Sequence, residues 1–141
     1  MGTSVDLASF ARKVDKVLDE LSNEAMLKQV GMAGKRIGGE EIRADSGGDG
    51  KLTNWRRNRP INLAPRFDLK GQNAVEIAPT VRGRGPVRVL NEGRKAGVSR
   101  RGRPYGASTG KGTWDRATGE MERELPRVAH EHVTKVLRKH F

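Results

Sequence analysis

The stretch INLAPRFDLKGQNAVEI, residues 61–77, is the part of the sequence that decides which class of fold to expect. The apolar residues of its first part, Ile61, Leu63, Phe67 and Leu69, fall on odd positions, and mostly polar residues lie between them. This is the period of a β-strand with one buried face. Pro65 cannot donate to a ladder, so we expect an edge or a bulge there. The turn residues 70–73 and the alternating run 75–77 predict an antiparallel neighbour.

On either side of this stretch, apolar residues recur at three- and four-residue steps, which is the period of an amphipathic helix. The N-terminal stripe is interrupted near Ser22, so it allows one long helix or two, and Gly31, Gly34 and Gly38 weaken its later part. In the C-terminal stripe, Pro126 either begins the helix or kinks a longer one. The side chains that we expect to form a core between the two helical segments are Phe10, Val14, Val17, Leu18, Val133, Val136 and Leu137.

The chain of 141 residues is long enough for one domain with a modest core. We expect a single α+β domain, with an N-terminal amphipathic helix in residues 5–43 and a small antiparallel sheet in residues 51–93. A basic, glycine-rich arm or loop follows in residues 94–112, and a C-terminal amphipathic helix in residues 113–141. Within the sheet region, residues 86–93 allow either a third short strand or a helical turn. No apolar run is long enough to span a membrane, and cysteine is absent.

Positive charge is concentrated in the middle of the chain. The formal net charge is +11, and residues 51–111 hold 15 of the Lys and Arg residues but only 3 of the Asp and Glu residues. The residues that we expect to contact a partner are Arg82, Arg84, Arg88, Arg94, Lys95, Arg100, Arg101 and Arg103. Docking on an acidic protein surface, contact with nucleic-acid phosphates and a solvated loop all remain open. Stacking on bases is not expected, because few aromatic residues are interleaved.

The stretch GASTGKGT, residues 106–113, is similar to a phosphate-binding loop but fails its spacing. Gly106 is one residue too close to Gly110, and Gly112 stands where the motif requires a hydroxyl group. We expect instead a loop that ends at Thr113, whose side chain caps the last helix. His130 and His132 are two residues apart on a helix and point in different directions, so no metal site is predicted. We expect no catalytic residue, no cofactor and no enzymatic activity.

The order of elements carries a resemblance to a known family. An N-terminal helix and a small sheet precede RVLNEGRKAG (residues 88–97), a glycine-rich arm, GKGTWDRAT (residues 110–118) and a closing helix. This order resembles the small neck or tail-completion proteins of long-tailed double-stranded DNA phages, a family often labelled putative tail component. VLNEGRKAG is similar to the strand-then-E-x-G element of that family, and GTWDRAT is similar to its C-terminal portion. The basic arm is longer here than in many relatives.

The resemblance implies a structural protein of the virion that is assembled in the host cytoplasm. Its copies would form a homo-oligomeric ring in the head–tail connector, joining head to tail around the DNA channel. Its partners would be other neck, connector and tail-tube proteins, with non-specific contact to genomic DNA in the channel and no membrane. The alternative is a basic accessory protein that contacts duplex phosphates through residues 82–103.

Overall fold

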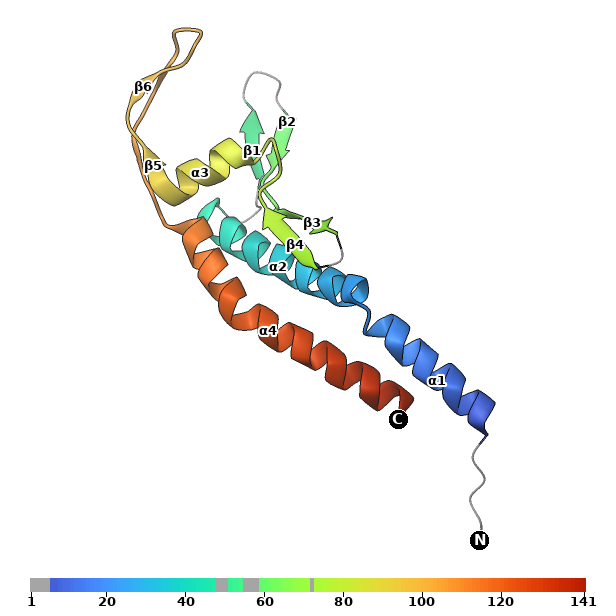
Figure 1. Cartoon of the computed structure of the whole chain (residues 1–141). Helices are drawn as coiled ribbons and strands as arrows, with labels where there is room; N and C mark the ends of the chain where they lie inside the picture. Colours follow the sequence, from blue (N-terminus) through green and yellow to red (C-terminus); the bar gives the residue numbers. More distant parts are fainter. Residues whose placement is uncertain (1–5, 48–50, 55–58, 72) are drawn as a thin grey trace.

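The computed structural model describes residues 6–47, 51–54, 59–71 and 73–141, and it has the expected α+β architecture with helices at both ends (Figure 1). In chain order, the elements of these ranges are α1 (Leu7–Glu20), α2 (Asn23–Asp45), β1 (Lys51–Asn54), β2 (Arg59–Asn62), β3 (Arg66–Lys70), β4 (Ala74–Ala78), α3 (Arg84–Glu92), β5 (Gly93–Arg94), β6 (Gly97–Val98), β7 (Pro104–Tyr105), β8 (Ser108–Thr109) and α4 (Thr113–His140). The strands form antiparallel pairs, β1 with β2, β3 with β4, β5 with β8 and β6 with β7.

The N-terminal helical region is two helices, because each has its own cap. The Asp6 carboxylate accepts hydrogen bonds from the backbone N–H groups of Ala8 and Ser9 at the start of α1. The Ser22 hydroxyl accepts one from the N–H group of Ala25 at the start of α2. Capping side chains satisfy donors that the first turn of a helix leaves unpaired. The sequence allowed one long helix or two, and the structure has two.

The alternating stretch forms β3 and β4, with Phe67 paired to Ile77 and Leu69 to Val75 across the hairpin. The predicted antiparallel neighbour is therefore confirmed. Pro65 is fully buried and separates β3 from β2, which pairs with β1 instead. The region predicted as one sheet is thus a set of two-stranded ribbons. Its ambiguous last segment, residues 86–93, belongs mainly to helix α3.

Three glycines of α2 form the face of this helix that packs against the β3–β4 hairpin and Pro65. Gly31, Gly34 and Gly38 are all buried. A β-carbon at position 31 would overlap the ring of Phe67, and one at position 34 would overlap the side chain of Ile77. At position 38 a β-carbon would lie 2.9 Å from Cγ of Pro65. The missing side chains therefore let the β3–β4 hairpin lie directly on α2, and the cost in helix propensity is offset by this close packing.

The core lies where α2, α4, α3 and the strands meet. One cluster joins Ile37 of α2 to Ala117 and Met121 of α4. A second joins Ile42 of α2, Leu63 of the β2–β3 connection and Val87 of α3. The half-buried indole of Trp114 packs against both clusters and so links them into one core.

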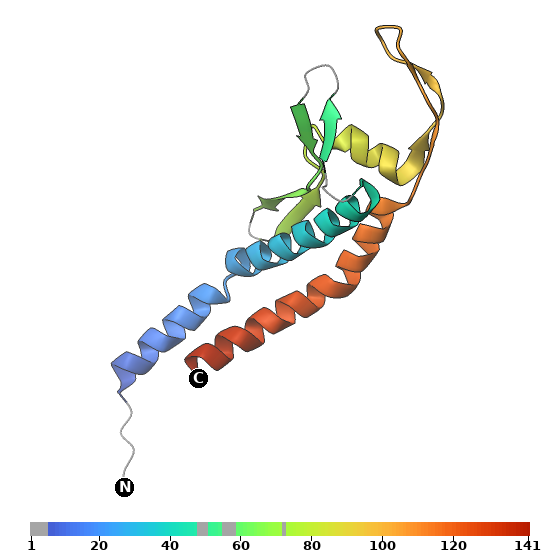
Figure 2. The ribbon, with the colours of Figure 1, turned by 180° about the vertical axis from the view of Figure 1, so that it is seen from behind.

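The core predicted between the two terminal helical segments is only partly correct. Val17 and Val136 are buried, and Val14 and Val133 are half-buried. Phe10, Leu18 and Leu137 are 49%, 63% and 43% exposed, so their predicted burial was wrong. The physical reason is that α1 extends beyond the strands and lies only beside the last part of α4 (Figure 2).

Helix α4 contains Pro126 in its interior, so the longer of the two predicted helices is the one that forms. Its last turn holds α1 through Glu20. The Glu20 carboxylate accepts hydrogen bonds from Nζ of Lys139 and Nε2 of His140, each at 3.1 Å. These contacts, led by that with Lys139, lower the pKa of Glu20. No helix in the described ranges has the length and apolar character needed to cross a membrane.

The glycine face can be tested with a pair of substitutions in one helix. Gly31→Ala should lower the free energy of unfolding by about 1 kcal/mol, because the clash with Phe67 outweighs the gain in helix propensity. Gly39→Ala should raise it by up to about 1 kcal/mol, since a β-carbon there meets only Pro65 at 3.9 Å. Urea unfolding measures both changes, and equal effects at the two positions would contradict the packing described.

Candidate partner-binding arm

Residues 93–110 form a two-stranded ribbon, which we call the arm. Its strands β5 and β8 pair near the body, and β6 and β7 pair farther out. At the tip, the N–H group of Ser99 donates to the carbonyl of Arg103 at 2.8 Å, and Gly102 turns the chain with a φ of +78°. The part of the arm beyond β5 and β8 stands clear of the helices in both views (Figure 1, Figure 2). The predicted arm therefore exists, as a paired hairpin.

Two glycines allow the arm to leave the body at the end of α3. Gly93 ends that helix with a φ of +79°, a conformation that other residues rarely adopt. A β-carbon at Gly110 would lie 2.5 Å from the carbonyl carbon of Glu92. The returning strand is then held by the end of α3, because the N–H group of Lys111 donates to the carbonyl of Leu90 at 2.7 Å. The root of the arm is therefore closely packed backbone.

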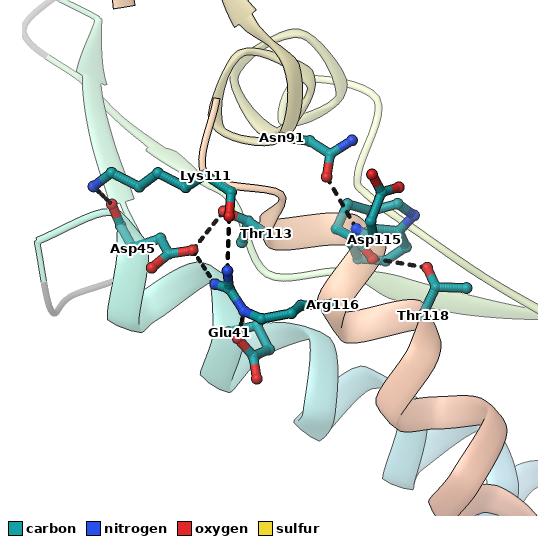
Figure 3. Close-up of polar contacts among 9 residues, drawn as sticks. Glu41, Asp45, Asn91, Lys111, Thr113, Asp115, Arg116 and Thr118 are labelled. Carbon is teal, nitrogen blue, oxygen red and sulfur yellow. Dashed lines mark hydrogen bonds and ion pairs between the residues drawn. The ribbon is translucent and has the colours of Figure 1, made fainter. Parts of the chain in front are cut away.

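A polar network, which we call the anchor, ties this root to α2 and α4 (Figure 3). Asp45, the last residue of α2, accepts a hydrogen bond from the hydroxyl of Thr113 at 2.6 Å. Arg116 forms ion pairs with Asp45 and Glu41 and donates to the carbonyl of Lys111 at 2.7 Å. The ammonium group of Lys111 donates to the backbone carbonyl of Asp45 at 3.0 Å. The anchor thus joins two segments that are far apart in the sequence, residues 41–45 and residues 111–116.

The anchor corrects the expectation for residues 106–113. Thr113 does not cap α4 with its side chain, since its hydroxyl is fully buried and donates to Asp45. Gly112 precedes the helix instead, with a φ of +64°. The hydrogen bond from the Thr113 hydroxyl, with smaller contributions from Arg116 and Lys111, lowers the pKa of Asp45. The ion pair with Asp45 in turn raises the pKa of Arg116.

The eight basic residues predicted to contact a partner are all exposed, but they do not form a single arm. Arg82 lies in the turn before α3, and Arg84 and Arg88 lie on α3 itself, where Arg88 pairs with Glu92 at 3.0 Å. Arg82, Arg84 and Arg88 therefore lie outside the arm, which was predicted for residues 94–112. The residues that do lie on the arm are Arg94, Lys95, Arg100, Arg101 and Arg103.

The arm combines positive charge with apolar surface. No acidic residue occurs between Glu92 and Asp115. Val98 and Tyr105, on the paired strands β6 and β7, are 64% and 39% exposed. The guanidinium carbon of Arg94 lies 4.8 Å from the centre of the Tyr105 ring, a cation–π contact that holds the ring against the ribbon. Because Tyr105 pairs with Gly97 and Val98 with Pro104, these two apolar side chains lie on opposite faces of the ribbon.

The described residues contain no group of three or more His, Asp or Glu side chains that could hold a metal ion. The ring of His132 instead contacts the backbone, with Nε2 at 2.8 Å from the carbonyl oxygen of Glu20.

Comparison of the chain with protein-family models, with curated proteins and with solved structures finds no match.

The buried hydroxyl of Thr113 provides a first test of the anchor. Thr113→Val should lower the free energy of unfolding by about 1–2 kcal/mol, because it leaves Asp45 without its closest neutral donor. Thr118→Val is the matched control, since its exposed hydroxyl donates only to the carbonyl of Trp114 within its own helix. Chemical denaturation compares the two variants, and an equal small loss in both would contradict a structural role for Thr113.

The lowered pKa of Asp45 predicts how the anchor responds to acid. The ionised Asp45 carboxylate stabilises the folded state. This stabilisation is fully present above the ordinary pKa of 3.8, and it is lost as the pH falls through the lower pKa of the folded state. Asp45→Asn should therefore destabilise the protein near neutral pH, and the difference from wild type should shrink in acid. Urea unfolding from about pH 6 to about pH 2 measures this. Asp15→Asn, at an exposed carboxylate, should show little difference across the same range.

Proposed function

We propose that this chain is a structural subunit of a phage head–tail connector, whose copies assemble into a ring that joins head to tail around the DNA channel. The single observation that carries the proposal is the arm, a ribbon with a fixed root and an outer half that packs on no other element of the described chain. An isolated two-stranded ribbon is only marginally stable in water. A neighbouring subunit that covers it would therefore complete the fold.

The charge of the chain supports an assembly with other macromolecules. Each copy carries a formal net charge of +11, so a ring of copies would repel itself without compensation. Acidic neighbours in the connector, or DNA in its channel, would supply that compensation. The resemblance of residues 110–118 to the tail-completion family supports the same setting. Residues 88–92 do not add to it, because they belong to helix α3 where that family's element was expected to begin with a strand. In this proposal the protein performs no chemistry and acts through binding alone.

A second candidate function is that of a DNA-binding accessory protein. The observation that favours it is the absence of acidic residues along an arm that carries five cations. The major groove of duplex DNA admits a two-stranded ribbon, and arginine contacts phosphates well. Such a protein would bind duplex DNA as a monomer, and its affinity would fall steeply with salt.

Electron microscopy of the purified full-length chain distinguishes the two functions. The connector proposal predicts closed rings of uniform diameter as the protein concentration rises. A protein that remains monomeric, and that binds duplex DNA with a steep salt dependence, would contradict the connector proposal and support the accessory function. Arg100→Glu with Arg101→Glu should abolish the ring in the first case and DNA binding in the second.

A further inference from the structure

Strand β3 has one edge that no other described strand covers. It pairs with β4 alone, so alternate residues of β3 direct their backbone N–H and C=O groups away from the hairpin. Strand β4 is the one nearer to α4, because Ile77 packs against the core cluster that α2 shares with α4. The free edge of β3 therefore faces the side away from α4. An edge of this kind is a template on which another strand can add.

A groove, which we call the edge groove, runs between this edge and α2 and has a volume of about 440 Å³. One wall is a face of α2, on which Met32, Lys35, Gly39 and Arg43 are spaced three or four residues apart. The other wall includes Phe67 of β3. The groove is open, since Met32 is 56% exposed and a β-carbon at Gly39 would meet only Pro65, at 3.9 Å.

The edge groove is positively charged. Its lining contains three cations and a single carboxylate, that of Glu40, which pairs with Arg36 at 3.7 Å. On β3 itself, Asp68 forms an ion pair with Arg66. The exposed cations here that form no ion pair with another described residue are Lys35, Arg43 and Lys70. A ligand that neutralises them must carry negative charge.

The neighbouring carboxylates do not cancel this charge. One turn beyond the groove on α2, Glu24 is already paired with Lys28 at 3.1 Å. Glu76 lies opposite Asp68 on β4, which places it one strand farther from the free edge. The three unpaired cations therefore set the sign of the charge along the groove.

An extended acidic peptide matches both the edge and the groove. The edge offers N–H donors and C=O acceptors in alternation, which another peptide backbone satisfies, whereas a phosphate backbone supplies acceptors alone. The side chains of an added strand alternate between its two faces, so apolar ones can cover Met32 and Gly39. Its carboxylates would come within reach of Lys35, Arg43 and Lys70.

A second copy of this chain fits the edge less well. Antiparallel pairing of two β3 edges about Asp68 would place Asp68 opposite Asp68 and Arg66 opposite Lys70. Like charges directly opposite each other destabilise a sheet. The charges of β3 therefore protect its edge against copies of itself and leave it open to an acidic strand.

We propose that the edge groove binds an extended acidic segment of a second protein, which adds to β3 as a third strand. Backbone hydrogen bonds would supply affinity, and the unpaired cations of α2 and β3 would select carboxylates. The inference goes beyond the proposed ring and does not depend on it, because the groove is built from α2 and β3 and contains no residue of the arm.

A synthetic peptide of about eight residues that alternates valine and glutamate is a suitable probe. Added to the isotope-labelled full-length chain near neutral pH, it should shift the backbone amide signals of residues 66–70. It should also slow hydrogen exchange at alternate amides of β3, those that point away from β4. Nuclear magnetic resonance measures both effects. A peptide that alternates valine and lysine is the control and should leave these amides unchanged.

Two variants test the groove itself. Lys35→Glu with Arg43→Glu should weaken binding of the valine–glutamate peptide about tenfold or more, because like charges then face it. The matched control is Arg12→Glu with Lys16→Glu, which makes the same change in charge at exposed positions of α1 and should bind as wild type does. Gly39→Leu should block the groove without changing its charge. Circular dichroism and thermal unfolding confirm that each variant is folded.

The inference would be overturned by β3 amides that do not respond to millimolar peptide, or by equal binding of the valine–lysine peptide. Dimerisation of the free chain through β3 would also overturn it, as would a duplex of about 20 base pairs that shifts the same amides. Rings seen by electron microscopy without peptide binding would leave the connector proposal standing. Peptide binding at β3 by a chain that forms no rings would support the edge groove and contradict the ring.

Discussion

The close approach of α2 to the β3–β4 hairpin is the constraint on which the rest of the structure depends. Gly31, Gly34 and Gly38 face Phe67, Ile77 and Pro65 without a β-carbon between them. A chain with so few large apolar residues gains its core by bringing backbones close together, since dense packing maximises dispersion contacts. With the hairpin against this face, the rest of α2 can pack on α4, and Trp114 joins the two clusters.

The position of the arm follows from this packing. Because α2 is fixed along its length, its last residue, Asp45, lies where Thr113 and Arg116 reach it. The arm therefore combines a rigid root with an outer half that only its own cross-strand bonds support. Such a division suits a part that must reach a neighbour at a defined angle and still adapt to its surface. It also explains why the cationic side chains need not contact the body that carries them.

The two ends of the molecule differ in character. The arm is cationic and narrow, whereas α1 and the end of α4 present large apolar side chains that are exposed. A protein with a small core leaves much apolar area unburied as a monomer, and oligomerisation is a common way to cover it. In the proposed ring, a neighbouring subunit would cover the exposed side chains of Phe10, Leu18 and Leu137.

Local periodicity and turn chemistry in the sequence determined the helices and the β3–β4 hairpin, because the interactions that form them connect residues close along the chain. The glycines of α2 were recognised only as a weakness of the helix, since their use depends on what lies opposite. Periodicity also showed which face of α1 is apolar, but it could not show that Leu7, Phe10 and Leu18 on that face stay exposed. Only the tertiary structure decided this and placed the anchor, because Asp45 and its partners are 66 to 71 residues apart in the chain.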